Sequence, residues 1–198
     1  MYKRQGLENG VEVNESYPLA GTSAYAKSKI KAEELISNWA VQNAIPLLIL
    51  RLPLVIGKNP KGNLERLQRV AKSRFQLKIF PDKSAKSIVH AQDVSDFVAS
   101  CSSVEGIYNL TDGVEYQFGE IYNYLSQNSN MKIPIYLPVF LLRLVGKFGD
   151  MFNRYWRIFP VNLASINKMQ SVLTFDTNKA CRELSWNPTK ALVRNINS

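Results

Sequence analysis

The sequence is poor in cysteine and histidine, and it contains no long apolar run. Its two cysteines, Cys101 and Cys181, lie far apart. They offer neither a disulfide framework nor the ligand spacing of a metal site. This low use of cysteine is typical of proteins in a reducing cytoplasm. The longest apolar stretches, such as IPLLIL and IPIYLPVFLL, are much shorter than the ~20 residues with which a helix crosses a bilayer. We therefore expect a cytoplasmic protein with no bound metal ion and no transmembrane helix.

The sequence also lacks a continuous basic run, although its formal net charge is +9 at pH 7. Such an excess suits a nucleic acid, a membrane surface or an anionic small molecule such as a nucleotide sugar. The basic residues are spread from Lys27 to Arg194, whereas nucleic-acid-binding tails concentrate them. This distribution argues against a nucleic acid as the partner.

What is present is an ordinary globular composition, 45% hydrophobic and 21% charged over 198 residues, which suffices for one core or slightly more. Residues 6–22 have no periodicity and predict a loop. A helix is predicted from Ala24 to about Asn43, with Thr22 or Ser23 as its cap and Pro46 beyond its end. The run LLILRLPLVIG that follows predicts a parallel strand buried on both faces. A helix followed by such a strand is typical of α/β proteins.

The apolar residues of that helix recur at helical spacing; they are Leu35, Ile36, Trp39 and Ala40. Further elements are predicted along the chain. They are an amphipathic helix in NLERLQRVAKSR, a strand around residues 76–80, a strand feeding a helix in SIVHAQDVSDFVASCSS, a strand in GIYNLTDG, and helices in YQFGEIYNYLSQN and TNKACRELSWNP.

Tyr25 and Lys29 lie four residues apart at the start of the first helix, so their side chains share one face. A free tyrosine is a poor base at neutral pH because its pKa is near ~10, and a neighbouring cation lowers that value by stabilising the phenolate. The spacing alone fits equally a surface tyrosine beside a solvated lysine that pairs with Glu33.

Five segments in this order resemble the extended short-chain dehydrogenase/reductase family, whose members are NAD-dependent epimerases, dehydratases and reductases of nucleotide sugars. The segments are Y-x-x-x-K at Tyr25, LRLPLVIG, KGNLERL, IVHAQDVSDF and FDTNKACRELSWNP, and the resemblance runs from Gly6 to Ile196. It implies the C-terminal part of a Rossmann-like, doubly wound parallel α/β sheet, together with a small α/β substrate-binding region.

The resemblance also implies how the chain divides. Residues 6–60 match the remaining part of the NAD-binding domain, and residues 61–198 match mostly a substrate-binding region with interleaved sheet strands. Residues 1–5, MYKRQ, have no helix or strand pattern and are expected to be a non-native leader. Helices like the one that bears Tyr25 commonly form the dimer interface in the family, so a homodimer of the full-length protein is expected.

The family mechanism assigns a role to each matching residue near the cofactor. Tyr25 exchanges a proton with a sugar hydroxyl or keto group, and Lys29 supports it and binds the nicotinamide ribose. Leu52, Pro53 and Val55 match the strand end beside the nicotinamide. The sequence departs from the family here, because Leu52 stands where relatives often have Pro and Ile56 where they often have Tyr. The cofactor contacts are therefore expected to differ in detail.

Four residues match positions at which the family holds the substrate diphosphate. Asn63 and Leu64 match a helix start that suits an anion, and Lys86 stands where relatives carry an arginine, a better bidentate partner. Lys168 matches a second basic site by a looser alignment. Solvated surface lysines explain Lys86 and Lys168 equally well.

His90 is the only histidine, and in the resembling families its position is structural, at a strand end. Asp93 and Asp96 are expected to cap and solvate the helix that follows, whose cap is predicted near Gln92 or Asp93.

The sequence has no G-x-x-G-x-x-G turn for the cofactor pyrophosphate. The family's catalytic Ser or Thr is missing too, because Ser16, Thr22 and Ser23 lie too close to Tyr25 to replace it. We expect the chain alone to bind NAD, or NADP, weakly and to be inactive.

Together these features predict an NAD(P)-dependent epimerase or 4-keto reductase of a nucleotide sugar, with a UDP-linked sugar of bacterial polysaccharide biosynthesis as substrate. Dehydratase chemistry stays open. A catalytically silent nucleotide-binding or scaffold protein of the same fold is the alternative, and the intact Tyr25 and Lys29 argue against it. The stretch PVFLLRLVGKFGDMFNRYWRIF fits either an interfacial membrane segment or a lid over the substrate pocket, and the lid is the favoured prediction.

Overall fold

The structure is a computed structural model, and it describes residues 9–21, 23–58, 60, 62–73, 75–101, 104–126, 133–144 and 163–193. The leader predicted at residues 1–5 lies outside these ranges. The chain forms two compact units. Unit 1 comprises residues 1–58, 86–115 and 173–198, and unit 2 comprises residues 59–85 and 116–172. The domain boundary near residue 60 that the family resemblance implies stays a prediction.

Unit 1 is built on parallel strands. One sheet has the order β1 (Gly10–Val13), β9 (Val172–Phe175), β5 (Ala85–His90) and β3 (Leu54–Ile56), and β7 (Glu115–Tyr116) also pairs with β5. A separate pair joins β2 (Leu48–Arg51) to β6 (Gly106–Asn109). The β1–β9, β2–β6 and β3–β5 pairs are all parallel. The predicted parallel α/β organisation is therefore confirmed.

The run LLILRLPLVIG forms two strands, so the prediction of one continuous strand was wrong. The break falls at Leu52 and Pro53, between β2 and β3. Proline cannot donate a ladder hydrogen bond, and after it the chain changes partner, from β6 to β5. The loop predicted at residues 6–22 likewise contains β1, which the sequence did not reveal.

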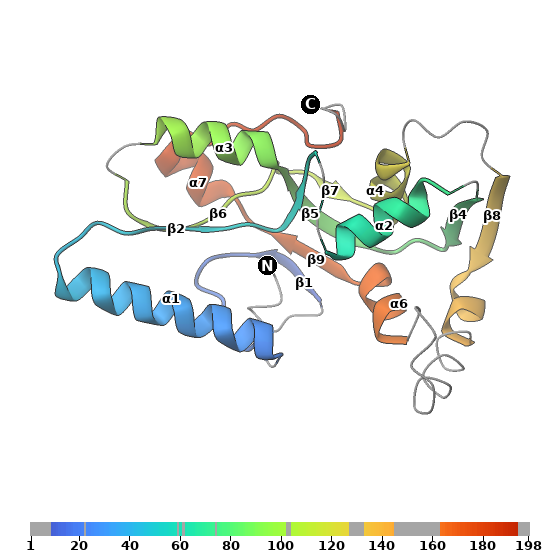
Figure 1. The fold of residues 1–198 in the computed structure, drawn as a ribbon, viewed down its shortest axis with the longest axis horizontal. Coiled ribbons are helices and arrows are strands. Elements are labelled where there is room, and N and C mark those ends of the chain that lie inside the picture. The colour runs from blue at the N-terminus through green and yellow to red at the C-terminus, as the bar shows by residue number, and fades with distance from the viewer. Residues whose placement is uncertain are drawn as a thin grey trace. The chain divides into compact units, whose positions relative to one another are not determined.

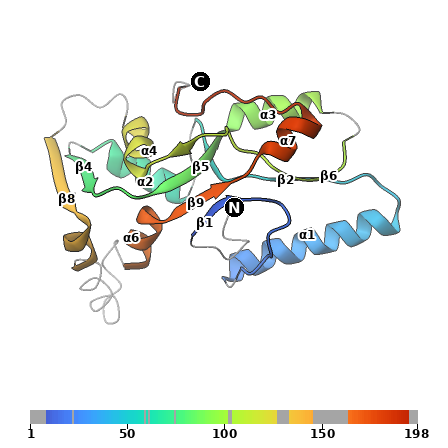
Figure 2. The same ribbon diagram turned by 180° about the vertical axis from the view of Figure 1, so that it is seen from behind.

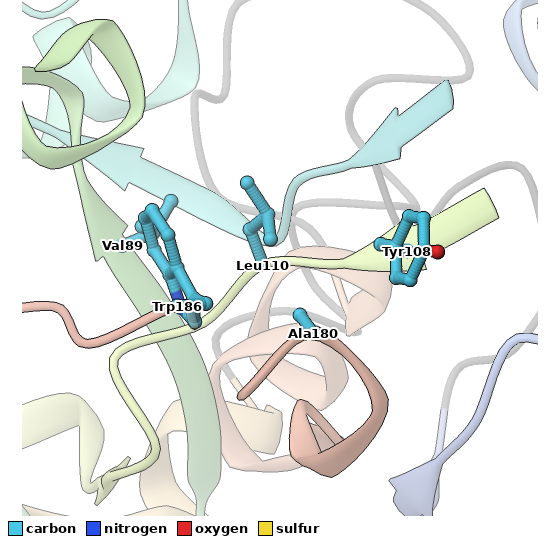
Figure 3. Packing of buried hydrophobic residues seen from close by; sticks show 5 residues of the cluster. All are labelled: Val89, Tyr108, Leu110, Ala180 and Trp186. Atoms are coloured by element: carbon cyan, nitrogen blue, oxygen red, sulfur yellow. The ribbon is translucent and has the colours of Figure 1, made fainter. Parts of the chain in front are cut away.

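Three helices cover the strands of unit 1: α1 (Ala24–Gln42), α3 (Ala91–Ser100) and α7 (Asn178–Leu184). In both views α1 lies on one side of the β2–β6 pair, and α3 and α7 lie on the other (Figure 1, and from behind in Figure 2). The side that faces α3 and α7 holds a buried cluster of five side chains, Val89, Tyr108, Leu110, Ala180 and Trp186 (Figure 3).

The residues of α1 that face the interior are mostly not the apolar residues whose spacing predicted the helix. Ala26, Glu33 and Ala40 are the buried ones, and they recur every seven residues along one stripe of the helix. Leu35, Ile36 and Trp39 are 58%, 47% and 52% exposed. The helix therefore presents an apolar face that is about half exposed to solvent.

Unit 2 combines a strand pair with helices. β4 (Phe75–Phe80) pairs in parallel with β8 (Ile133–Pro138), and residues 139–144 continue β8 as a short helix. The other helices are α2 (Asn63–Ala71), α4 (Phe118–Leu125) and α6 (Leu163–Gln170). α4 begins with a capping box between Gln117 and Glu120, which satisfies two amides at the helix start. The helix predicted in YQFGEIYNYLSQN is thus confirmed.

Candidate functional site

The first turns of α1 bring Tyr25 and Lys29 together. Lys29 Nζ lies 5.7 Å from the centroid of the Tyr25 ring, close enough for the ammonium to interact with the ring. Both side chains are exposed, Tyr25 by 48%. The predicted pairing on one helix face is confirmed, and the phenol is accessible to a ligand.

The start of α1 is fixed by a side-chain cap. Ser23 is in an extended conformation, and its Oγ accepts a hydrogen bond from the Ala26 amide at 3.1 Å. Ser23 is therefore occupied as the N-cap. The Ser16 hydroxyl donates to Asn14 Oδ1 at 2.8 Å. Thr22, the other cap suggested by the sequence, lies outside the described residues.

A buried polar network joins α1 to the strands. Arg51, at the end of β2, donates from Nη2 to Glu33 Oε1 of α1 at 2.6 Å and from Nη1 to the Glu15 carbonyl at 2.7 Å. The Glu15 carboxylate accepts from the Asn109 amide of β6 at 2.8 Å. Burial lowers the pKa of Arg51, and the charge of Glu15 opposes that shift. Glu33 therefore belongs to the interior of unit 1, not to a solvated surface pair.

The residues predicted to border the nicotinamide have different environments. Leu52 packs against the core cluster, Pro53 is buried, and Val55 is 36% exposed. Gly57, which follows β3, has φ +155°, and a Cβ atom there would lie 3.1 Å from Ala91 Cβ, at the start of α3. A glycine is thus required where the end of β3 meets α3, a constraint that the sequence alone did not reveal.

His90 ends β5 and is the N-cap of α3, two residues before Gln92, the earlier of the two caps that the sequence suggested. Its side chain is 1% exposed, and Nδ1 accepts a hydrogen bond from the Gln92 amide at 3.2 Å. Asp93 is not the cap but a buried residue of the first turn, whereas Asp96 is exposed and accepts from Gln92 Nε2 at 2.7 Å. These contacts give His90 a structural role.

The predicted diphosphate ligands are divided between the units. Lys86 lies on β5 in unit 1, while Asn63, Leu64 and Lys168 lie in unit 2. Asn63 opens α2 after Gly62, which provides no side-chain cap. Leu64 is only 7% exposed, so its side chain belongs to the core and only its amide can serve an anion. Lys168 is exposed on α6.

Unit 2 also contains a hollow of about 500 Å³ that the sequence did not predict. Its wall includes two phenylalanines, two cations and one amide, which are Phe80, Phe140, Lys83, Arg143 and Gln170. The backbone amide of Lys83 donates to Gln170 Oε1 at 3.4 Å. The pairing of β4 with β8 assembles this wall from segments far apart in the sequence, so no local sequence pattern predicts the hollow.

A larger hollow of unit 1, about 760 Å³, lies at the amino ends of β2 and β6. Beside it Tyr108 donates to Glu183 Oε2 at 2.9 Å, which raises the pKa of the Tyr108 phenol, and Lys179 Nζ lies 4.5 Å from the ring centroid. Ligands of open α/β sheets bind at the carboxyl ends of the strands. This hollow is therefore not the expected cofactor site.

Comparison with known proteins agrees with this geometry. The NAD dependent epimerase/dehydratase family matches residues 2–110, more than half of the chain. The chain belongs to that family. Its matched part contains the Tyr25 and Lys29 pair and both β2 and β3.

Individual relatives match over most of this chain but only part of their own length. N-acetyl-α-D-glucosaminyl-diphospho-ditrans,octacis-undecaprenol 4-epimerase of Escherichia coli O157:H7 is 24% identical over an alignment of 177 residues, and the match covers 84% of this chain and 53% of that protein. The chain thus spans about half the length of this curated relative.

Two solved structures illustrate the shared fold. UDP-glucuronic acid 4-epimerase from Bacillus cereus in complex with NAD is 14% identical with a TM-score of 0.65, covering 98% of this chain and 54% of that one. RMD from Pseudomonas aeruginosa complexed with NADPH is 14% identical with a TM-score of 0.66, covering 98% and 62%. The expected Rossmann-like fold is confirmed. Among the described residues, no helix is long and apolar enough to cross a membrane.

Proposed function

We propose that the protein carrying this chain is an NAD(P)-dependent epimerase or 4-keto reductase of a nucleotide sugar, with a UDP-linked sugar of polysaccharide biosynthesis as substrate. The observation that carries the proposal is the exposed Tyr25 with Lys29 Nζ 5.7 Å from its ring, in a chain that belongs to the epimerase/dehydratase family.

The proposed chemistry is proton transfer at the Tyr25 phenol. Tyr25 Oη takes the proton of a sugar hydroxyl when that carbon is oxidised and returns it when the keto group is reduced. The Lys29 ammonium lies 5.7 Å from the ring centroid, where its positive charge attracts the negative charge of a phenolate. Arg51 and Glu33 position both groups by holding α1 to β2.

The described residues fit the nicotinamide end of the cofactor. Tyr25 and Lys29 offer an exposed hydroxyl and ammonium for the ribose, and Val55 offers an exposed apolar side chain. A nicotinamide cofactor supplies the oxidising and reducing power when it is bound. Since the sequence has no glycine-rich turn, we expect the 198-residue chain by itself to show no turnover.

Within unit 2, the start of α2 and Lys168 are proposed to bind the diphosphate of the substrate, and the role of Lys86 stays an expectation from the family resemblance. The start of α2 has no side-chain cap, so its amide groups suit an anion. Lys168 is exposed on α6 and accessible to such a ligand.

A homodimer is proposed to form through the apolar face of α1. Leu35, Ile36 and Trp39 are exposed there, and burying such a face against a second copy is favourable by roughly 25 cal/mol per Å² of apolar surface. Sedimentation equilibrium of Trp39→Ser against the unchanged protein tests this. A monomeric variant is expected, and an unchanged dimer contradicts the interface.

A second candidate substrate is a sugar linked through diphosphate to a lipid. It is favoured by the relative from Escherichia coli O157:H7, whose name gives undecaprenol diphosphate as the carrier. Both substrates contain a sugar and a diphosphate. They differ in the group beyond the diphosphate.

The test is a substrate panel on the protein encoded by the full reading frame. UDP-N-acetylglucosamine with NAD, a 4-keto UDP-sugar with NADH or NADPH, and N-acetylglucosaminyl-diphospho-undecaprenol with NAD are each incubated, and products are separated by chromatography. An epimeric UDP-sugar supports the epimerase, and a reduced 4-keto sugar supports the reductase. If only the lipid-linked sugar is turned over, the second candidate substrate replaces the first. No turnover of any substrate, with nucleotide bound, favours the catalytically silent alternative.

A further inference from the structure

One face of unit 2 exposes apolar side chains between basic ones. The exposed fractions are 48% for Phe80, 61% for Tyr136, 63% for Phe140, 42% for Leu141 and 47% for Leu144. We call these five residues, together with Lys78, Lys83 and Arg143, the aromatic–basic surface. A contiguous exposed apolar set of this kind marks an interaction site more often than chance.

The surface is assembled by β4, β8 and the short helix after β8. The parallel register places Lys78 opposite Tyr136, and Lys78 Nζ lies 5.4 Å from the Tyr136 ring centroid. Phe80 follows two residues later on the same face of β4. β8 runs directly into the helix of residues 139–144 (Figure 1).

The short helix is anchored by one residue and presents the others outward. Leu142 is 8% exposed and holds the helix to the core of unit 2. Phe140 and Leu144 are one turn apart, so they share a face, and Arg143 lies beside them. Apolar residues on one side with a cation at the edge are typical of a helix in a membrane interface.

The hollow of unit 2 forms the polar part of this surface. Lys83 and Arg143 contribute cations to it, and Phe80 and Phe140 contribute rings. Gln170 Nε2 is buried and finds no hydrogen-bond acceptor among the described residues. Two cations and an unsatisfied amide donor suit the oxygen atoms of an anionic phosphate.

The charge of the surface has one sign. Residues 75–85 and 133–144, which build it, contain one carboxylate, Asp82. That carboxylate accepts hydrogen bonds from the Ser84 amide and hydroxyl through Oδ1 and from the Gly119 amide through Oδ2. Asp82 is thus engaged within unit 2, and the cations face the solvent.

We propose that the aromatic–basic surface docks on an anionic phospholipid bilayer. The lipid phosphates lie at Lys83 and Arg143, and Phe140 and Leu144 enter the boundary between headgroups and acyl chains. The sequence favoured a lid for the stretch from Pro138; its described part, residues 138–144, supports the membrane interpretation. The proposal rests on this surface alone and is independent of the proposed activity.

Flotation with vesicles tests the proposal on the 198-residue chain, because aggregated protein does not float. Vesicles of equal parts phosphatidylglycerol and phosphatidylcholine are compared with phosphatidylcholine alone. The variant F140S/R143S removes one ring and one cation of the surface. The control V98S/K190S removes an exposed apolar residue and an exposed cation of unit 1. Far-UV circular dichroism and thermal midpoints establish that both variants fold.

The unchanged chain and the control are expected to float with the anionic vesicles and to dissociate as salt is raised. F140S/R143S is expected to bind about tenfold more weakly. Absence of flotation overturns the proposal, as does equal flotation with phosphatidylcholine alone. Equal binding by F140S/R143S overturns it too, because lipid then binds elsewhere. If the chain does not float but associates with itself, and F140S/R143S abolishes that association, the surface binds a second copy instead of lipid.

Discussion

The two units differ in what they bury. Among the described residues, the buried carboxyl and imidazole side chains, Glu33, His90, Asp93 and Asp112, all belong to unit 1. In the described part of unit 2, the buried polar residues other than tyrosine are three serines, Ser84, Ser126 and Ser171. Its largest buried side chains include Tyr122, Ile121, Leu125 and Ile166. Unit 1 is thus held by directional polar contacts as well as by a core, and unit 2 mainly by apolar packing.

This difference matches the two tasks proposed for the units. Proton transfer by Tyr25 needs a fixed helix, and the contacts of Arg51 with Glu33 and Glu15 fix α1 to β2. A surface that binds lipid or substrate needs exposed groups more than a rigid interior. Single polar substitutions should therefore damage unit 1 strongly and unit 2 weakly.

The largest effect is expected from Arg51→Met. The change leaves the Glu33 carboxylate buried without its cation, which costs about 3–5 kcal/mol of stability. The matched control is Arg69→Met in unit 2, where the Arg69–Glu65 pair has side-chain exposures of 77% and 50%. Breaking that pair is expected to cost about 0.3–0.5 kcal/mol. Urea denaturation measures both, and equal losses would contradict the contrast between the units.

A smaller loss is expected from Trp186→Phe. Trp186 Nε1 donates to the Thr111 carbonyl at 2.7 Å, and the indole meets Phe97 edge to face with centroids 5.4 Å apart. The variant keeps an aromatic ring but leaves a buried carbonyl unsatisfied, at about 1–3 kcal/mol. Thermal unfolding checks this. A midpoint unchanged from the parent would show that the hydrogen bond adds nothing to the packing.

Ser23→Ala should destabilise the start of α1 by about 1 kcal/mol, because the Ala26 amide loses its cap. The control is Ser28→Ala, whose hydroxyl donates to the Tyr25 carbonyl at 2.8 Å within the helix. That change replaces serine by the better helix former and is expected to be neutral or slightly stabilising. Hydrogen exchange of the first-turn amides distinguishes them, with faster exchange in Ser23→Ala only.

The smallest effect, of opposite sign, is expected from Tyr124→Phe in unit 2. Tyr124 is 2% exposed, and its hydroxyl finds no hydrogen-bond partner among the described residues. Removing a buried unsatisfied hydroxyl should stabilise the fold by up to about 1 kcal/mol. Tyr122→Phe, which loses a hydroxyl that donates to the Val70 carbonyl at 3.5 Å, should instead be destabilising. A loss of stability in Tyr124→Phe would mean that its hydroxyl is satisfied.

Tyr124 also predicts a dependence on pH. Burial raises the pKa of its phenol above the ordinary value of 10.0. The folded state therefore holds this proton more tightly than the unfolded state does. The stability that comes from this tighter proton binding is fully present below pH 10 and is lost as the pH rises through the raised pKa. The free energy of unfolding of Tyr124→Phe should fall less steeply in that range than that of the parent.

Much of the fold was predictable where local signals were strong. The helix after Ser23 has a good cap and a Pro beyond its end, and its observed range, Ala24–Gln42, is one residue shorter than predicted. β1 and β7 are only four and two residues long, too short for a periodic pattern. The buried stripe of α1 was not predictable, because its central residue is a charged Glu33 whose partner Arg51 lies on another element.

The site was predictable only where it is local in sequence. Tyr25 and Lys29 lie one helical turn apart, so spacing alone placed them together. Gly57 against Ala91, and the hollow between Phe80 and Phe140, depend on chain segments that meet only in the fold. Leu64 was predicted as a diphosphate neighbour, yet its side chain is buried, because the same helix start must also close the core.

The most direct test of the central claim is the turnover of Tyr25→Phe in the protein of the full reading frame. Its control is Tyr17→Phe, which changes another exposed tyrosine of unit 1, 43% exposed. If Tyr25 transfers the proton, its loss should lower the turnover rate by about 10²–10⁴-fold while the control retains the parent rate. Equal rates in the two variants would contradict the account.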